Sequence, residues 1–394
     1  MIDNLPNGWK EEKIGNIIDL TIGKTPSRKK SEYFTGDNLW VSIADIKSIN
    51  LTNTKEKITE QAIKDSNIKK VKAGTLIMSY KLSIGKMAFT SQDLYTNEAI
   101  VALNIKINDL DKKFLYYYLL NADLEKTTDR AVKGKTLNKA KIEQIHIQFP
   151  PLQQQEKIVK VLDLTSNLIE KQKELLEKYD LFLKSKFIEM FGDPITNPMG
   201  WEVVKLENIC NKITDGTHNS PPMSENGFKY ITAKHIKENK IDFEKDETYI
   251  SEEEHKKIFS RCNPMKGDVL YIKDGATTGI ACINTLEEEF SLLSSVALLK
   301  PSLNIKSEYI VLYLNNKSVK ENILLNMAGG AIKRLTIKKI KDIEIPVPNI
   351  ELQNKFASIV EKIETIKEKE NQKLKQMNDL HNSMMNKAFK GEIK

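Results

Sequence analysis

Two long stretches of the chain repeat apolar residues at helical spacing. In residues 151–192, apolar side chains recur from Ile158 to Met190 at steps of three, four and seven, with Lys and Glu between them. Residues 349–394 follow the same pattern from Phe356 onward. These steps put apolar side chains on one face of a helix. The pattern predicts two amphipathic helices, and roughly 38 helical residues would span on the order of 57 Å.

The regions before these helices carry shorter β-branched and aromatic runs, which are typical of strands. The runs lie at residues 39–43, 75–79 and 99–105, and again at 229–233, 269–273 and 296–299. Apolar helices are expected at 114–120 and 309–314, and Thr59 and Ser251 are expected to cap helices, Ser251 with Glu254 as a capping box. Prolines at 150, 151 and 348 end each region because proline disfavours helix in the residue before it.

The chain is an internal duplication. Gly8-Trp9 recurs as Gly200-Trp201, 192 residues later, and Gly85 is echoed by Gly279. The segment 101–103 matches 296–298, and the offset is a constant 198 residues from positions 137 and 335 to positions 191 and 389. A repeat fixes the architecture before its elements are assigned. We therefore expect an α+β protein with two similar domains at 1–150 and 193–348, and spacer helices at 151–192 and 349–394.

Connectivity predicts how the two helices pair. The chain must build its second domain before the second helix starts, so an antiparallel coiled coil would put one domain at each end, related by a pseudo-twofold axis. The alternative is that each apolar stripe packs only on its own domain.

Composition narrows the class of protein. The 394 residues are 40% hydrophobic with a net charge of +7, a mean hydropathy of −0.43 and a pI near 8.9. No apolar run approaches the roughly 18 residues of a membrane span, and the first residues lack a secretion signal, so a cytoplasmic protein with no membrane role is expected. Cys210, Cys262 and Cys282 form no CxxC pair, which argues against disulfides and a thiolate zinc site.

An ordered set of motifs resembles the specificity subunit of Type I restriction-modification enzymes across essentially the whole chain. The motifs are LPNGW at 5–9, TPS at 25–27, YFTG at 33–36, WVSIADI at 40–46, FPPLQQQ at 149–155, FGDP at 191–194 and NPMGW at 197–201. The second unit departs in two places: Pro348-Asn349-Ile350 stands where a double proline is usual, and Gly329-Gly330-Ala331 replaces the spacing seen around Gly134.

This resemblance implies the function and the partners. It implies two target-recognition domains, each binding one half of a split site in double-stranded DNA, and helices that act as a ruler and dock two methyltransferase subunits. Those partners would hold S-adenosylmethionine and methylate adenine at N6, and separate restriction subunits would cut unmodified DNA. This chain itself would carry no catalytic residue, cofactor or metal.

Three fragments that suggest chemistry fail on inspection. Gly23-Lys24-Thr25 lacks the earlier glycine of a phosphate-binding loop, since position 18 is Ile18. The segment SPPM at 220–223 resembles an amino-methyltransferase motif but lacks its aromatic residue. The five histidines have no close metal-ligand spacing, and His381 is expected to be a solvated or seam residue. Two alternatives stay open: a self-contained methyltransferase or nuclease, and a coiled-coil scaffold whose end domains bind protein or sugar.

The candidate DNA contacts are basic, hydroxyl and amide side chains in loops beside the strands. Lys and Arg neutralise phosphates, whereas Arg, Asn, Ser and Thr also read base edges. In the first domain these are Thr25, Ser27, Arg28, Lys29, Lys30, Lys81, Ser83, Lys86, Lys133 and Lys135. In the second they are Thr217, His218, Asn219, Lys234, His235, Lys273, Thr277, Thr278, Lys333 and Arg334. Arg28 and Arg334 are favoured because the guanidinium group binds guanine or phosphate through two bonds.

Overall fold

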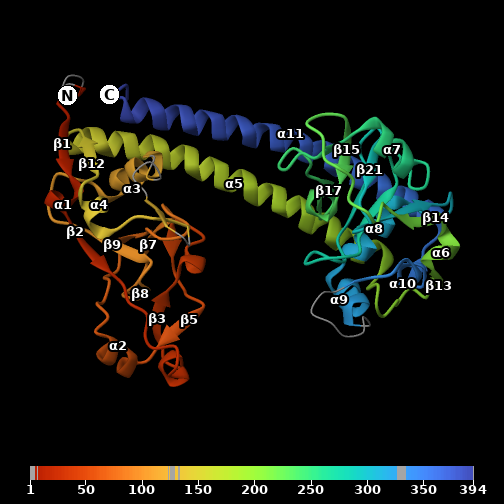
Figure 1. Cartoon of the computed structure of the whole chain (residues 1–394), viewed down its shortest axis with the longest axis horizontal. Helices are drawn as coiled ribbons and strands as arrows, with labels where there is room; N and C mark the ends of the chain where they lie inside the picture. The colour runs from red at the N-terminus through yellow and green to blue at the C-terminus, as the bar shows by residue number, and fades with distance from the viewer. Residues whose placement is uncertain are drawn as a thin grey trace. The chain divides into compact units, whose positions relative to one another are not determined.

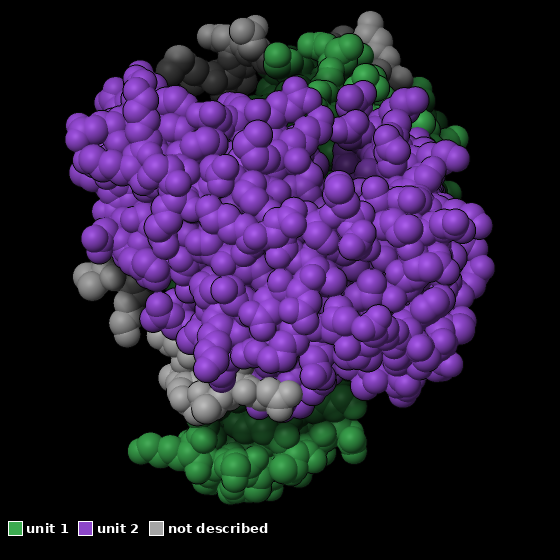
Figure 2. Space-filling model, turned by 90° about the vertical axis from the view of Figure 1, so that its right-hand side faces the viewer, with its two compact units in different colours: residues 1–172, 373–394 green, residues 173–372 purple. Residues whose placement is uncertain are grey.

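The computed structural model describes residues 5–6, 8–122, 124, 129–131, 134–325 and 334–393, without the side chains of 129–131 and 134–136. It divides into two compact units (Figures 1 and 2). Unit 1 is Met1–Gln172 with Lys373–Lys394, and unit 2 is Lys173–Gln372. Each long helix, α5 (Leu152–Phe191) and α11 (Ile350–Phe389), therefore contributes one end to each unit.

Unit 1 is a mixed α/β fold built on two small sheets. A five-stranded sheet has the order β2-β9-β6-β7-β4, a three-stranded sheet has the order β5-β3-β8, and β1 pairs with β12. The strands are β1 Lys10–Lys13, β2 Ile18–Ile22, β3 Asn38–Val41, β4 Asn50–Leu51, β5 Glu56–Ile58, β6 Leu76–Ser79, β7 Met87–Thr90, β8 Tyr95–Thr96, β9 Ile100–Ile105, β10 Asp129–Ala131, β11 Gly134–Thr136 and β12 His146–Phe149. The short helices are α1 Ile14–Ile17, α2 Glu60–Ser66, α3 Lys112–Asn121 and α4 Lys139–Glu143.

Unit 2 repeats this topology. Its sheets have the orders β14-β22-β19-β20 and β18-β15-β21, and β13 pairs with β23. The strands are β13 Glu202–Lys205, β14 Cys210–Asp215, β15 Phe228–Ile231, β16 Ile236–Lys237, β17 Lys240–Ile241, β18 Tyr249–Ile250, β19 Val269–Ile272, β20 Ala281–Ile283, β21 Phe290–Leu292, β22 Val296–Pro301 and β23 Glu344–Val347. The helices are α6 Leu206–Ile209, α7 Glu252–Phe259, α8 Ser307–Asn315, α9 Lys317–Leu325 and α10 Ile337–Lys341. The expected fold of two similar mixed α/β domains and two long helices is confirmed.

The structure corrects the predicted alignment of the repeats at β9 and β22. Tyr80 N donates to Ala99 O at 3.0 Å, and Lys273 N donates to Ser295 O at 2.9 Å, so Ala99 corresponds to Ser295. Val101 is then equivalent to Ala297, one residue later than the sequence match suggested. A one-residue shift exchanges the two faces of a strand. The corrected register puts Val101 and Ala297 in the same layer of their cores, against the long helices.

Inside each unit the two long helices pack on each other and on the domain. In unit 1 Thr165 Oγ1 lies 2.7 Å from His381 Nδ1, which confirms the seam position expected for that histidine. In unit 2 Lys367 Nζ donates to Asp180 Oδ1 at 2.7 Å. Residues nearer the start of α5 thus lie beside residues nearer the end of α11, and the helices run antiparallel in both units, as predicted. The predicted apolar faces of residues 151–192 and 349–394 also include Leu168, Ile366 and Leu380, and these three side chains are exposed rather than buried.

Aromatic side chains join the helices to the core of unit 2. Phe187 and Phe191 of α5 contact Phe356 of α11 with ring centroids 5.8 and 5.1 Å apart. Both also pack on Tyr309 of α8, at 5.3 and 4.8 Å. The two alternatives therefore occur together, because the apolar face of each long helix packs both on the other long helix and on the core of the domain.

A buried glutamine at the start of each long helix fixes that helix to its domain. Gln155 Oε1 accepts from the amide of Asp111, the N-cap of α3, at 2.8 Å, and its Nε2 donates to the carbonyls of Asp109 and Pro150 at 2.8 and 2.7 Å. Gln353 makes the equivalent bonds in unit 2, including one from the amide of Lys306, the N-cap of α8, at 2.9 Å. The constant offset of 198 residues thus preserves a specific buried contact.

The predicted caps form with one difference. The hydroxyl of Thr59 accepts from the Ala62 amide, and that of Ser251 accepts from the Glu254 amide at 3.4 Å. The Glu254 carboxylate lies 2.9 Å from Lys257 Nζ rather than closing the capping box.

Candidate nucleic-acid interface

The candidate loops of unit 1 meet at one end of its larger sheet. Neighbouring strands in the order β2-β9-β6-β7 are antiparallel, so the end of β2, the start of β9 and the end of β6 lie at the same edge. Backbone hydrogen bonds join the loops there. Lys24 N donates to Thr96 O at 2.9 Å, and Gly23 N donates to Ile100 O at 3.2 Å. In unit 2 the loops after β14 and β19 meet the start of β22 at the same edge. We call this the sheet edge of each unit.

A glycine is required where the chain crosses each sheet edge. A Cβ on Gly23 would lie 2.1 Å from Thr96 O, and one on Gly216 would lie 1.9 Å from Leu292 O. Both contacts are to backbone atoms and are far shorter than real Cβ contacts. The two glycines are equivalent, so both units share one loop geometry and differ in the side chains that the loops carry.

Arg28 is the most constrained candidate in unit 1. Its guanidinium group donates to both carboxylate oxygens of Glu56 at 2.5 and 2.9 Å and lies over the rings of Phe34 and Trp40, 4.3 and 5.0 Å from their centroids. The hydrogen bond from Arg28 lowers the pKa of Glu56 below its usual value. The guanidinium group of Arg28 is therefore held against two aromatic rings and is already paired with a carboxylate.

The other candidates of unit 1 are side chains that contact neighbouring residues and side chains that are exposed. Thr25 donates to Glu98 at the sheet edge, and Lys81 lies over the ring of Tyr80, 5.4 Å from its centroid. Lys30 Nζ donates to the hydroxyl of Tyr33 at 2.7 Å. The exposed candidates of unit 1 also include Ser27, Lys29, Ser83 and Lys86. Lys133 and the side chain of Lys135, which is in β11, lie outside the described residues.

Three candidates of unit 2 are buried, which corrects their assignment as surface contacts. His235 is 0% exposed, its Nδ1 accepts from Thr232 N at 3.0 Å, and its Nε2 donates to Asp246 O at 2.8 Å. Burial lowers the pKa of His235. Lys273 is 2% exposed and pairs with a buried carboxylate, while the hydroxyl of Thr278, which is 3% exposed, donates to Gly275 O at 2.7 Å. These three side chains support the loops from inside.

The remaining candidates of unit 2 lie at the surface. Thr217 and Asn219 form a small turn, in which the Thr217 hydroxyl donates to Asn219 O at 3.0 Å. Lys234 pairs with Asp246 at 2.8 Å, and Arg334 Nε lies 3.7 Å from Asp274 Oδ2. Exposed positions are Lys234, His218, Asn219, Thr277 and Arg334, and Lys333 lies outside the described residues.

Sequence reasoning missed Arg261, although the chain has only four arginines. This residue lies in the loop between α7 and β19. Its side chain is 50% exposed and donates to Gly216 O and to Asp215 Oδ1, the latter at 3.4 Å. Its contact with Asp215 at the end of β14 joins residues 46 apart in sequence, so the rarity of arginine was the one signal in the sequence that could have identified it.

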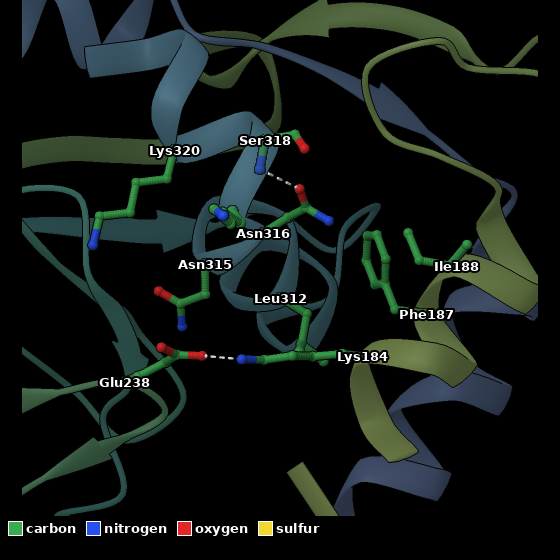
Figure 3. A pocket seen from close by; sticks show the side chains of 10 residues that line it. Lys184, Phe187, Ile188, Glu238, Leu312, Asn315, Asn316, Ser318 and Lys320 are labelled. Atoms are coloured by element: carbon green, nitrogen blue, oxygen red, sulfur yellow. Dashed lines mark hydrogen bonds and ion pairs between the residues drawn. The ribbon is translucent and has the colours of Figure 1, made fainter. Parts of the chain in front are cut away.

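A cavity of about 390 Å³ in unit 2 is lined by residues of α5, α8 and α9 and of the turn between β16 and β17 (Figure 3). The Lys184 ammonium group pairs with Glu238 at 2.7 Å across it. Asn315 donates to Asn239 Oδ1 and Ala281 O and accepts from Ala281 N, each at 2.8 to 2.9 Å. The polar groups of this cavity are engaged in the fold, and among the described residues no group of three or more His, Cys, Asp or Glu is placed to hold a metal ion.

Comparisons with known proteins agree with the duplicated fold. The model of the Type I restriction modification DNA specificity domain matches twice, at residues 6–178 and 198–376. The specificity subunit of the MjaIX Type I restriction enzyme of Methanocaldococcus jannaschii is 26% identical, covering 91% of this chain and 88% of the relative. That of the EcoBI enzyme of Escherichia coli is 22% identical, covering 77% of this chain and 70% of the relative.

Solved structures show the same fold. The S subunit of a Type I restriction-modification system from M. genitalium has a TM-score of 0.53 at 16% identity, covering 98% of this chain and 97% of that one. A chain from a study of complex assembly and conformational transition in the Type I system has a TM-score of 0.55 at 19% identity, covering 98% of both chains. None of the helices within the described ranges is both long and apolar enough to cross a membrane.

Proposed function

The chain belongs to the family of Type I restriction modification DNA specificity domains, and on that premise we propose that it recognises a two-part sequence in double-stranded DNA, one half with each unit. The observation that carries this proposal is that the two units have sheet edges of the same backbone geometry but with different side chains. Unit 1 places Ile22 and Tyr80 where unit 2 places Asp215 and Lys273. Two sheet edges with the same backbone arrangement and different side chains are suited to bind two different DNA half-sites.

The two sheet edges carry side chains of different charge, which supports a preference for different bases in the two half-sites. In unit 1 the carboxylate of Glu98 accepts from Thr25, and a carboxylate accepts hydrogen bonds from amino groups such as cytosine N4. In unit 2 the corresponding edge carries Arg261 and Arg334, whose guanidinium groups donate to acceptors such as guanine O6 and N7. Surface lysines around both edges would supply the sequence-independent attraction to phosphates.

We propose that this chain performs no catalysis. Within the described residues, Ser291, His255 and Glu289 are arranged like a catalytic triad, with His255 Nδ1 3.0 Å from Ser291 Oγ and Nε2 3.3 Å from Glu289. Ser291 is 0% exposed and His255 is 2% exposed, so a substrate cannot reach the hydroxyl. Methyl transfer from S-adenosylmethionine would then be the work of two partner methyltransferase subunits, and DNA cleavage that of restriction subunits.

The outer face of α5 in unit 1 supports docking of such a partner. Leu164 and Leu168, one helical turn apart, are 61% and 43% exposed. They lie on a different face from the buried Ile158 and Leu162, which serve the core. An exposed apolar pair next to the seam is suited to a partner protein.

Exchanging residues 1–150 for the corresponding domain of a relative tests the proposal. The hybrid is assembled with its methyltransferase subunits, and the methylated DNA sequence is read. We expect one half of the recognised sequence to change and the other half to stay. A change in both halves, or in neither, would contradict one half-site per unit.

A further inference from the structure

Three charged or titratable side chains gather around Asp215 at the sheet edge of unit 2. Asp215 ends β14, and its side chain is 6% exposed. Its Oδ2 lies 3.2 Å from Lys273 Nζ, and Lys273 is itself 3% exposed in its side chain. Its Oδ1 lies 3.4 Å from Arg261 Nη1 and 3.5 Å from His218 Nε2. One carboxylate thus faces two permanent cations, which leaves the cluster with a positive charge.

The buried pair is fixed from both sides. A Cβ on Gly216 would lie 1.9 Å from Leu292 O, so the backbone next to Asp215 is closely packed. Lys273 N donates to Ser295 O at 2.9 Å, and Lys273 O accepts from Leu335 N at 2.7 Å. The carboxylate is therefore a fixed internal anchor, neutralised on its inner side by Lys273.

Arg261 is the member of this cluster that reaches the surface with a fixed orientation. One terminal nitrogen donates to Gly216 O and the other to Asp215. Its own carbonyl accepts from Lys212 Nζ at 2.7 Å, which holds the backbone as well. A guanidinium group has five N–H donors in one plane, so two inward bonds set the direction of the donors that remain.

We infer that Arg261 is a specificity-determining residue that reads a guanine edge in one half-site, and that Asp215 is the residue that positions it. This inference rests on the proposed function. A guanidinium plane held in one direction suits the paired acceptors O6 and N7 of guanine. The same planar group can also bind a phosphate, and the selection experiment below separates a base contact from a phosphate contact. The equivalent edge of unit 1 has Ile22 and Tyr80 in place of Asp215 and Lys273, so the effect belongs to unit 2 alone.

The test uses the full chain in complex with its methyltransferase subunits and a library of random-sequence duplex DNA. Bound duplexes are selected and sequenced for the wild type and for Arg261→Lys, Arg261→Ala, Asp215→Asn and Lys256→Ala. Lys256 is the matched control, because it is an exposed cation on α7 paired with Glu252. Arg261→Lys is the decisive variant, since it keeps the charge and loses the planar donor set, while Asp215→Asn also leaves Lys273 without its counter-ion.

We expect both Arg261 variants to lose on the order of 10-fold to 100-fold selectivity for guanine at one position. Asp215→Asn should relax the same position, and Lys256→Ala should relax none.

A merely structural defect would weaken every position of the half-site together. An unchanged consensus with Arg261→Lys overturns the inference and leaves the proposed function intact. A uniform loss of affinity with a salt dependence lowered by about one charge would mean a phosphate contact and also overturns it. A wild type that selects no two-part sequence contradicts the proposed function itself.

Discussion

The substitution Gln155→Leu removes three buried hydrogen bonds at the start of α5. Leucine has a similar volume, so little packing is lost, but the amide of Asp111 and the carbonyls of Asp109 and Pro150 lose their partner. Gln155 is 0% exposed, so water does not replace it. Each such bond contributes about 0.5–1.5 kcal/mol, and stranded groups add a desolvation cost, so unit 1 should lose about 3 kcal/mol or more.

The equivalent substitution in unit 2 provides an internal comparison. Gln353 is also 0% exposed, but one of its three bonds, to Asn304 O, is 3.4 Å long and therefore weak. We expect Gln353→Leu to cost unit 2 about 2 kcal/mol, less than its counterpart costs unit 1. Gln153→Leu is the control, because Gln153 lies on the exposed face of α5.

Hydrogen exchange followed by mass spectrometry measures these effects unit by unit. Gln155→Leu should increase exchange in α3 and the first turns of α5, and Gln353→Leu in α8 and the first turns of α11. Urea midpoints should fall in the same order, with Gln153→Leu close to the wild type. Equal losses for Gln153→Leu and Gln155→Leu, or none for either, would refute the role of the buried glutamines.

Two further predictions concern unit 2. Burial lowers the pKa of His235 in the folded state, so below about pH 6.5 the unfolded chain binds more protons. Unit 2 should thus lose stability as the pH falls from about 7 towards 5. The His235→Gln variant should lose less stability over that range. Equal losses for the wild type and the variant, measured by urea unfolding, would contradict this reasoning. Gly216→Ala should destabilise the sheet edge by about 2 kcal/mol or more, because its Cβ would meet the Leu292 carbonyl, and unchanged exchange at residues 292–295 would argue against the crossing.

The long helices and most strands could be predicted because local pattern determines them. The helical period in residues 151–192 persists over many turns, and the strand runs near Leu76 and Val269 are short and β-branched. Strand order could not be predicted, since pairing such as β3 with β8 depends on contacts between residues far apart in sequence. The alignment of Val101 with Val296 failed for a related reason, because neighbouring apolar residues in a buried strand look alike and only the hydrogen-bond register separates them.

The sequence placed the candidate DNA contacts in loops beside the strands, but it did not predict which loops meet. The structure brings the loops after β2 and β6 together at the sheet edge of unit 1. The sequence could not tell which basic side chains point inward, and Lys273 and His235 are buried where a surface contact was expected. Arg261 was missed because its contact with Asp215 is tertiary and joins two residues that are far apart in sequence.

Methylation-sensitive sequencing of host DNA, with and without an intact copy of this chain, tests the central claim most directly. Recognition of one half-site by each unit predicts a methylated motif of two short sequences separated by a spacer of fixed length, and both halves should disappear together when the chain is absent. A single uninterrupted motif, or a two-part motif that persists without the chain, would contradict the account.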